Sequence, residues 1–244
     1  MSRRLLAILL ALAVGGAAAA EWPVVALPPG AQPISMGPQM LAGGVPLRLQ
    51  GFVAEASPAG VAAWFRRQLG RPLVENQVGG KLVLGGARGG HYITVQLGAD
   101  GQRTRGVVAV ADLRTAAARR GANQAAHERL LARFPSGTRI VSALDSVDGA
   151  RSARHVVLSN GYSEEVNRAR LVAMLREEGM ALEREARAGA LGTQALPAGA
   201  AAGSTLFFSG PGKEAMAVIS RGGDNHVNVV LNTINTIATM EPYK

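Results

Sequence analysis

The sequence predicts an α+β protein of two similar lobes, an internal duplication in which each lobe is a helix packed on an antiparallel β-sheet. One observation is a repeated motif, in which Leu27, Pro28, Gly30 and Ser35 recur 107 positions later as Phe134, Pro135, Gly137 and Ser142. The other is a matching order of elements after each copy. The chain therefore divides into a signal peptide (1–20), a first α+β repeat (21–113), a linker helix (114–133) and a second α+β repeat (134–244).

Residues 1–20 have the pattern of a secretory signal peptide. Arg3 and Arg4 precede an uncharged apolar run, which ends in the small residues Ala18 to Ala20. The run is shorter than the ~20 residues that a membrane span requires. We therefore expect cleavage before Glu21 and a periplasmic or secreted protein. Arg, Glu, Gly or Pro interrupts every later apolar run, so we expect no transmembrane span in the mature chain.

The composition indicates a light, aliphatic core and a basic surface. Hydrophobic residues make up 48% of the chain, but aromatic residues only 4%. The net charge of +9 attracts anions such as nucleic acid, lipid headgroups or acidic glycans. Joint enrichment in Ala, Gly and Arg, as in a GC-rich coding sequence, is an alternative explanation of this charge. The chain contains no Cys, so disulfides cannot stabilise it.

In the first repeat, residues 45–53 alternate between apolar and polar and predict a strand. Ser57 and Pro58 then predict the start of a helix that Gly70 ends. Val61, Trp64, Phe65 and Leu69 share one face of this helix, which we expect to be buried. Gly-rich turns separate four further strands, expected near 73–77, 81–84, 92–97 and 106–111, which predicts an antiparallel meander.

The Ala-rich segment 114–133 favours a helix and follows the first repeat as a tether. The second repeat begins with strands near 140–144 and 155–158. A helix from Ser163 to Gly179 follows, with Glu164 and Glu165 placed favourably in its first turn. After a strand at 180–185 and an Ala/Gly/Pro loop at 189–203, strands are expected at 205–209, 215–220 and 227–234.

No motif predicts catalysis or a cofactor. The Gly85–Gly90 loop lacks the G-x-G-x-x-G spacing and leads into a strand, so a hairpin turn explains it better than a phosphate cradle. There is no Cys nucleophile and no G-x-S-x-G motif. His91, His127, His155 and His226 are scattered, without the spacing of a metal site. We therefore expect no catalytic residues, no cofactor and no metal, and a protein that is not an enzyme.

Two groups of polar residues are candidates for partner contact. Arg119 and Arg120 form a basic pair on the linker, and His226, Asn228 and Asn232 are evenly spaced along the last strand. An exposed linker surface and the solvent side of a strand are the commoner explanations of such residues.

Three function classes remain open. The first is a non-catalytic adaptor that binds another envelope protein in a secretion, pilus or transport assembly. The second is a module that binds a small anionic or amphipathic ligand between the repeats, which would be marked by a pocket with several inward Arg residues. The third is an unrecognised hydrolase. The first is favoured, because duplicated sheet modules without polar clusters suit protein binding; nucleic acid is not an expected partner.

Overall fold

The computed structural model describes residues 22–37, 39–187 and 203–236. The predicted signal peptide and most of the predicted loop 189–203 lie outside the described residues. The helices are α1 (Pro58–Leu69), α2 (Leu113–Leu131) and α3 (Glu164–Glu177). The strands of the N-terminal half are β1 (Gln32–Ser35), β2 (Gln39–Ala42), β3 (Val45–Ala54), β4 (Val74–Val78), β5 (Lys81–Arg88), β6 (His91–Asp100) and β7 (Arg103–Asp112). Those of the C-terminal half are β8 (Arg139–Asp148), β9 (Arg151–Asn160), β10 (Ala181–Arg187), β11 (Gly203–Gly210), β12 (Lys213–Arg221) and β13 (Val227–Thr236).

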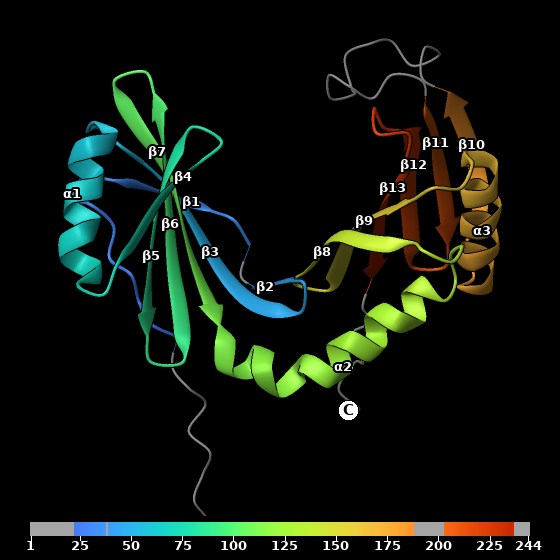
Figure 1. The fold of residues 1–244 in the computed structure, drawn as a ribbon, viewed down its shortest axis with the longest axis horizontal. Coiled ribbons are helices and arrows are strands. Elements are labelled where there is room, and N and C mark those ends of the chain that lie inside the picture. The colour runs from blue at the N-terminus through green and yellow to red at the C-terminus, as the bar shows by residue number, and fades with distance from the viewer. Residues whose placement is uncertain (1–21, 38, 188–202, 237–244) are drawn as a thin grey trace, which may run out of the picture.

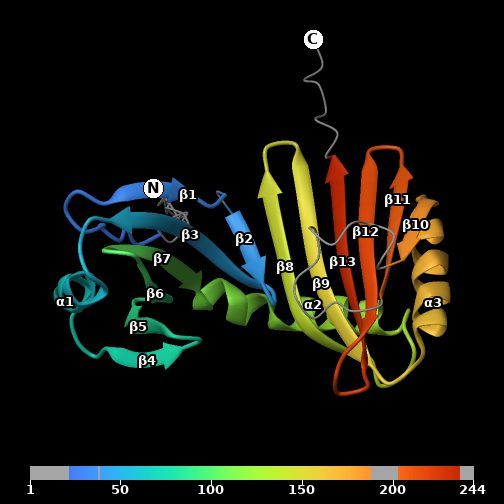
Figure 2. The same ribbon diagram turned by 90° about the horizontal axis from the view of Figure 1, so that it is seen from above.

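The thirteen strands of the described residues belong to one sheet, in the order β10-β11-β12-β13-β9-β8-β2-β3-β7-β6-β5-β4, with β1 paired to β3 beside this path. The central pair, β2 with β8, is termed the seam. On the N-terminal side of the seam, β3, the strand before α1, comes next, and β7, the last strand of that half, follows it. On the C-terminal side the corresponding strands are β9, which precedes α3, and β13. In Figure 1 the two halves of the sheet stand on either side of a central gap, with α1 and α3 at the outer ends and α2 below. Figure 2 shows that the strands of the two halves run in different directions, so the sheet is strongly twisted across the seam.

The prediction of two separate helix-on-sheet lobes is wrong. Strand makes up 53% of the structure and helix 23%, and the strands of both halves form one continuous antiparallel sheet. The cause is β2, which the sequence did not predict as a strand. It pairs with β3 through Met40 to Ala42 and with β8 through Gln39 to Ala42, and so joins the two halves.

Two hydrophobic cores lie within this single sheet. In the N-terminal half, Phe52, Val61 and Phe65 are buried together with the apolar side chains of β5, β6 and β7. In the C-terminal half, Leu171 and Leu175 of α3 are buried with side chains from β9, β11, β12 and β13. The two groups of buried residues have no member in common. Each core therefore lies between one helix and its own half of the sheet.

The ends of α1 and α3 follow the predicted capping residues. The Ser57 hydroxyl accepts a hydrogen bond from the Gly60 N–H at 3.3 Å, and the Ser163 hydroxyl accepts one from the Val166 N–H at 3.2 Å. Gly70 follows α1 with a φ of 71°, a left-handed value that favours glycine. On α1, Phe65 is fully buried, whereas Trp64 is only partly buried and meets the Phe65 ring edge-on with centroids 4.8 Å apart.

A buried pair of amides secures the start of α3. Asn160 and Asn167 are 2% and 0% exposed, and their side chains exchange hydrogen bonds of 2.8 and 3.0 Å. Asn160 also donates to the Thr138 hydroxyl at 3.1 Å. Because buried amides are costly when unpaired, this network ties the second copy of the repeated motif to the helix.

The segment predicted as a linker helix forms α2, which contacts β3 and β6 of the N-terminal half and β8 of the C-terminal half. The Asn123 side chain donates a 3.0 Å hydrogen bond to the Gly44 carbonyl oxygen between β2 and β3. No residue of α2 is fully buried. The helix thus lies along the sheet as a second connection between the halves (Figure 1). None of the helices in the described part of the chain is long and apolar enough to cross a bilayer.

Candidate functional site

A cavity of about 280 Å³ lies beside the seam and is termed the seam pocket. It collects residues from the start of the described chain, from β2, β3 and β8, and from the first turns of α2. Its lining is Trp22, Met40, Leu41, Pro46, Leu47, Arg48, Asp112, Thr115, Arg119, Asp145, Ser146 and Val147. Because both halves and α2 contribute, the pocket exists only when the whole sheet is assembled.

One wall of the seam pocket is a stack built on Trp22. The Arg48 guanidinium lies 4.7 Å from the centroid of the Trp22 ring, a cation–π arrangement. Trp22 also lies against His91, with ring centroids 5.2 Å apart. His91 is buried, and its Nε2 has no hydrogen-bond partner among the described residues. The stack restrains Arg48 at the pocket wall.

The two carboxylates of the seam pocket already have partners. Asp112 caps α2: its Oδ1 accepts from the Thr115 N–H at 2.9 Å, and its Oδ2 accepts from the Thr115 hydroxyl at 2.7 Å. These hydrogen bonds, first the backbone and then the side-chain one, lower the pKa of Asp112. Asp145 Oδ1 lies 3.4 Å from Arg154 Nε, an ion pair that lacks hydrogen-bond geometry. Both carboxylates therefore already have partners within the protein.

The two cationic side chains of the seam pocket, Arg48 and Arg119, have no partner of opposite charge among the described residues. Neither Arg48 nor Arg119 forms an ion pair with any carboxylate in residues 22–37, 39–187 or 203–236. Met40, Leu47 and Val147 supply apolar surface beside them. The pocket thus combines two available guanidinium groups with an apolar wall, which suits a carboxylate carried on an apolar stem.

The other predicted contact residues lie elsewhere. Arg120 follows Arg119 along α2 but lines a different hollow, together with Gly44, Asn123 and His127. Asn228 and Asn232 lie on the same face of β13, and Asn232 Oδ1 is 2.6 Å from His155 Nδ1 on β9. The structure therefore separates the predicted residues and brings only Arg119 to the seam pocket.

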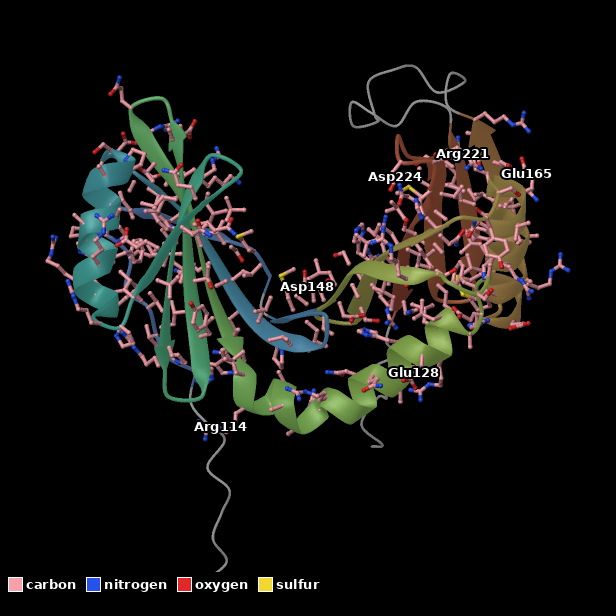
Figure 3. All side chains as sticks on the ribbon, in the orientation of Figure 1. Arg114, Glu128, Asp148, Glu165, Arg221 and Asp224 are labelled. Atoms are coloured by element: carbon pink, nitrogen blue, oxygen red, sulfur yellow. The ribbon has the colours of Figure 1, made fainter. Side chains whose placement is uncertain are left out.

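His226 precedes β13, in the turn from β12. Its backbone N–H donates to Asp224 Oδ1 at 3.1 Å, and its Nδ1 lies 3.5 Å from Asp224 Oδ2. Figure 3 shows Asp224 and Arg221 at the same end of the sheet as Glu165. Hydrogen bonding to its own backbone N–H and to Ser163, with Arg221 nearby, lowers the pKa of Glu165. These contacts explain the polar residues at this end as turn and helix-cap residues.

Side chains that could bind a metal ion are not clustered in the described part of the chain. Among those residues, no group of three or more His, Cys, Asp or Glu side chains could hold a metal ion. Thr115 and Ser146 are the hydroxyl side chains of the seam pocket, and the Thr115 hydroxyl is bonded to Asp112. The arrangement favours binding of an anion over activation of a nucleophile.

Sequence reasoning missed Trp22 and Arg48. Trp22 lies in a Pro-rich stretch without periodicity, so no pattern marked it. Arg48 has the same parity along β3 as the buried Phe52 and Ala54, but Arg48 itself is exposed, so no burial pattern marked it. Its contact with the Trp22 ring joins two separate segments of the chain.

Comparison of the chain with protein-family models, with curated proteins and with solved structures found no match, so the seam pocket has to be interpreted from its own geometry.

Proposed function

We propose that this protein is an exported, non-catalytic adaptor of a bacterial envelope assembly, such as a secretion, pilus or transport apparatus, and that it holds an acidic segment of a partner protein in the seam pocket. The observation that supports the proposal is the pair Arg48 and Arg119, two guanidinium groups without a carboxylate partner among the described residues, beside an apolar wall. A side-chain carboxylate between two Arg residues gains charge-assisted hydrogen bonds. The net charge, +9 for the whole chain and +7 once Arg3 and Arg4 are removed with the signal peptide, adds a general attraction for acidic partners.

The binding test uses Trp22 as an internal reporter. The chain has only two Trp residues, so Trp64→Phe leaves Trp22, in the pocket wall, as the sole indole. In that background, a peptide of alternating Glu and Leu residues is titrated at physiological ionic strength. We expect saturable quenching or enhancement of the Trp22 emission, and roughly a tenfold weaker affinity in Arg48→Gln and in Arg119→Gln, because hydrogen bonds to charged groups contribute about 1.5–3 kcal/mol.

Arg120→Gln is the matched control. It removes the same charge from the neighbouring position of α2, but it lies outside the seam pocket. Equal losses in Arg119→Gln and Arg120→Gln would show that the peptide responds only to overall charge and would contradict a site at the seam.

Export has its own test, independent of the pocket. The signal-peptide pattern leads us to expect that protein recovered from a periplasmic fraction begins at Glu21 by intact-mass analysis. Recovery of the chain from membranes with Met1 still present would contradict export in this form.

A second candidate is a periplasmic module that binds a small anionic or amphipathic ligand in the same pocket. The volume of about 280 Å³ favours it, because this is close to the lower end of the range for small-molecule sites, ~300 Å³. A fatty acid and a short dicarboxylate, titrated against the Trp22 reporter, separate the two candidates. Micromolar binding of either, with no response to the acidic peptide, would favour the ligand-binding function over the adaptor.

A further inference from the structure

The outer edge of β4 lies at one end of the sheet, and no other strand of the described chain pairs with it. Natural sheets usually protect such edges with charges, Pro residues or bulges. The opposite end of the sheet has these devices: β10 carries Glu183, Arg184, Glu185 and Arg187, and its register shifts between Leu182 and Arg184. The short strand β1, beside the main path, carries Pro33.

The β4 edge lacks these devices. Its five residues pair with β5 without a register shift. Its single charged residue, Glu75, is neutralised by Arg66 of α1 through two hydrogen bonds of 2.8 Å. Val74 and Val78 are 62% and 59% exposed, more than any other large hydrophobic residue in a described helix or strand. The edge therefore has no bulge and no unpaired charge, and it is apolar at both ends.

The hairpin geometry fixes which backbone groups of β4 point outward. Gly79 and Gly80 have φ values of 57° and 75°, as in a type I′ two-residue turn, so Val78 and Lys81 form the hydrogen-bonded pair that closes it. Because such pairs alternate along antiparallel strands, the backbone N–H and C=O groups of Glu75 and Gln77 point away from β5. The Gln77 N–H is accordingly bonded at 2.8 Å to the side-chain Oδ1 of its neighbour Asn76 and not to β5.

The sequence of β4 is close to a palindrome about Asn76. If two copies of the strand run antiparallel with Asn76 opposite Asn76, Val74 lies opposite Val78 of the second copy. Glu75 then lies opposite Gln77 of the second copy, so the residues with outward backbone groups face each other and no two like charges are opposed. A register centred on Glu75 would oppose two carboxylates, and one centred on Gln77 would leave the Val residues unmatched.

We propose that β4 pairs with β4 of a second copy of this chain, antiparallel and centred on Asn76, so that two sheets join across a two-fold axis. The contact consists of one short strand from each copy, well below the ~1,200 Å² of a standard interface. The dimer is therefore weak and reversible. Sedimentation velocity should show dimer formation with a dissociation constant on the order of 100 µM, as for weak, transient contacts.

Cysteine crosslinking tests the register directly, because the natural chain has no Cys. Asn76→Cys places two thiols across the two-fold axis, where the Cα–Cα separation of about 4.5 Å in a non-hydrogen-bonded pair permits a disulfide. Val74→Cys alone places its thiols about 13 Å apart, four residues out of register, and should not crosslink. A mixture of Val74→Cys and Val78→Cys chains should form only the mixed dimer.

A second pair of variants tests the backbone contact. Gln77→Pro removes an outward N–H without removing a bond to β5, and it should weaken the dimer at least tenfold, whereas Gln77→Ala keeps the N–H and should leave the dissociation constant within about twofold. Circular dichroism checks that both variants are folded. A monomer at all concentrations up to about 500 µM, a dimer insensitive to Gln77→Pro, or crosslinking at Val74→Cys in place of Asn76→Cys would each overturn the proposal.

Discussion

Asp112 is the residue at which strand β7 becomes helix α2, and its carboxylate has two partners on Thr115. Because the folded protein lowers the pKa of Asp112, the unfolded chain binds its proton more readily. The charged cap therefore contributes stability above the ordinary Asp pKa of about 4, and this contribution is lost as the pH falls through the lower folded pKa.

We expect Asp112→Ala to lower the free energy of unfolding at pH 7 by about 0.5–2 kcal/mol, the usual effect of removing an N-cap. Asp112→Asn keeps an acceptor but cannot titrate, so the difference between it and the wild type should shrink as the pH is lowered below about 4. Urea unfolding from pH 7 to pH 3 measures both. A difference that stays constant over this range would contradict a role for the Asp112 charge.

Single residues also show where sequence reasoning reaches its limit. Periodicity correctly assigned Val61 and Phe65 to the buried face of α1, but it could not say that Phe65 is fully buried while Trp64 is only partly buried, because that depends on the sheet opposite. Arg119 was a candidate, whereas Arg48 and Trp22, which complete the seam pocket with it, come from segments far away in sequence. The buried amides Asn160 and Asn167 carry no sequence pattern at all.

At the scale of elements, two glycines illustrate how one substitution can have opposite effects. Gly121 lies within α2, and a Cβ there would meet nothing within 4 Å. Gly106 lies on β7 beneath the buried Phe52 ring, where a Cβ would come within 2.2 Å of Phe52 Cζ.

Gly121→Ala should raise the free energy of unfolding by about 0.5–1 kcal/mol, because Ala loses less backbone entropy in a helix. Gly106→Ala should lower it by about 1–3 kcal/mol, because the core has to shift to admit the methyl group. Urea midpoints of the two variants decide the matter. Stabilisation by Gly106→Ala would mean that Phe52 is loosely packed.

Elements with local signals could be predicted, and elements defined by distant partners could not. The caps at Ser57 and Ser163 and the Gly-rich hairpin turns are encoded by neighbouring residues, so both helices and the meanders were expected. Strand β2 has no such signal: it is four residues long and exists because β3 and β8 flank it. Since the merged sheet depends on β2, the error at one short strand became the error in the fold class.

At the scale of the whole molecule, one sheet contains two separate cores. Leu171→Ala removes a fully buried side chain from the C-terminal core and should cost about 2–5 kcal/mol. Phe65→Ala should do the same to the N-terminal core.

We expect each substitution to destabilise its own half more than the other. Hydrogen exchange measured by mass spectrometry should show faster exchange in β9 and β11 to β13 for Leu171→Ala, and in β5 to β7 for Phe65→Ala. An equal increase across both halves in either variant would show that the seam makes the sheet a single cooperative unit.

The halves are joined at two places, by the β2–β8 pairing and by α2, which at 19 residues is about 28 Å long. With a single connection the halves could rotate relative to each other. With two connections the rotation is restricted, and the length of α2 fixes the angle between the two halves of the sheet. The seam pocket is lined by residues of both connections, so any change of the angle between the halves would alter its shape. A ligand that binds the seam pocket more tightly at one angle between the halves would stabilise that angle. By thermodynamic linkage, a second partner that favours the same angle would strengthen binding at the pocket by the same free energy.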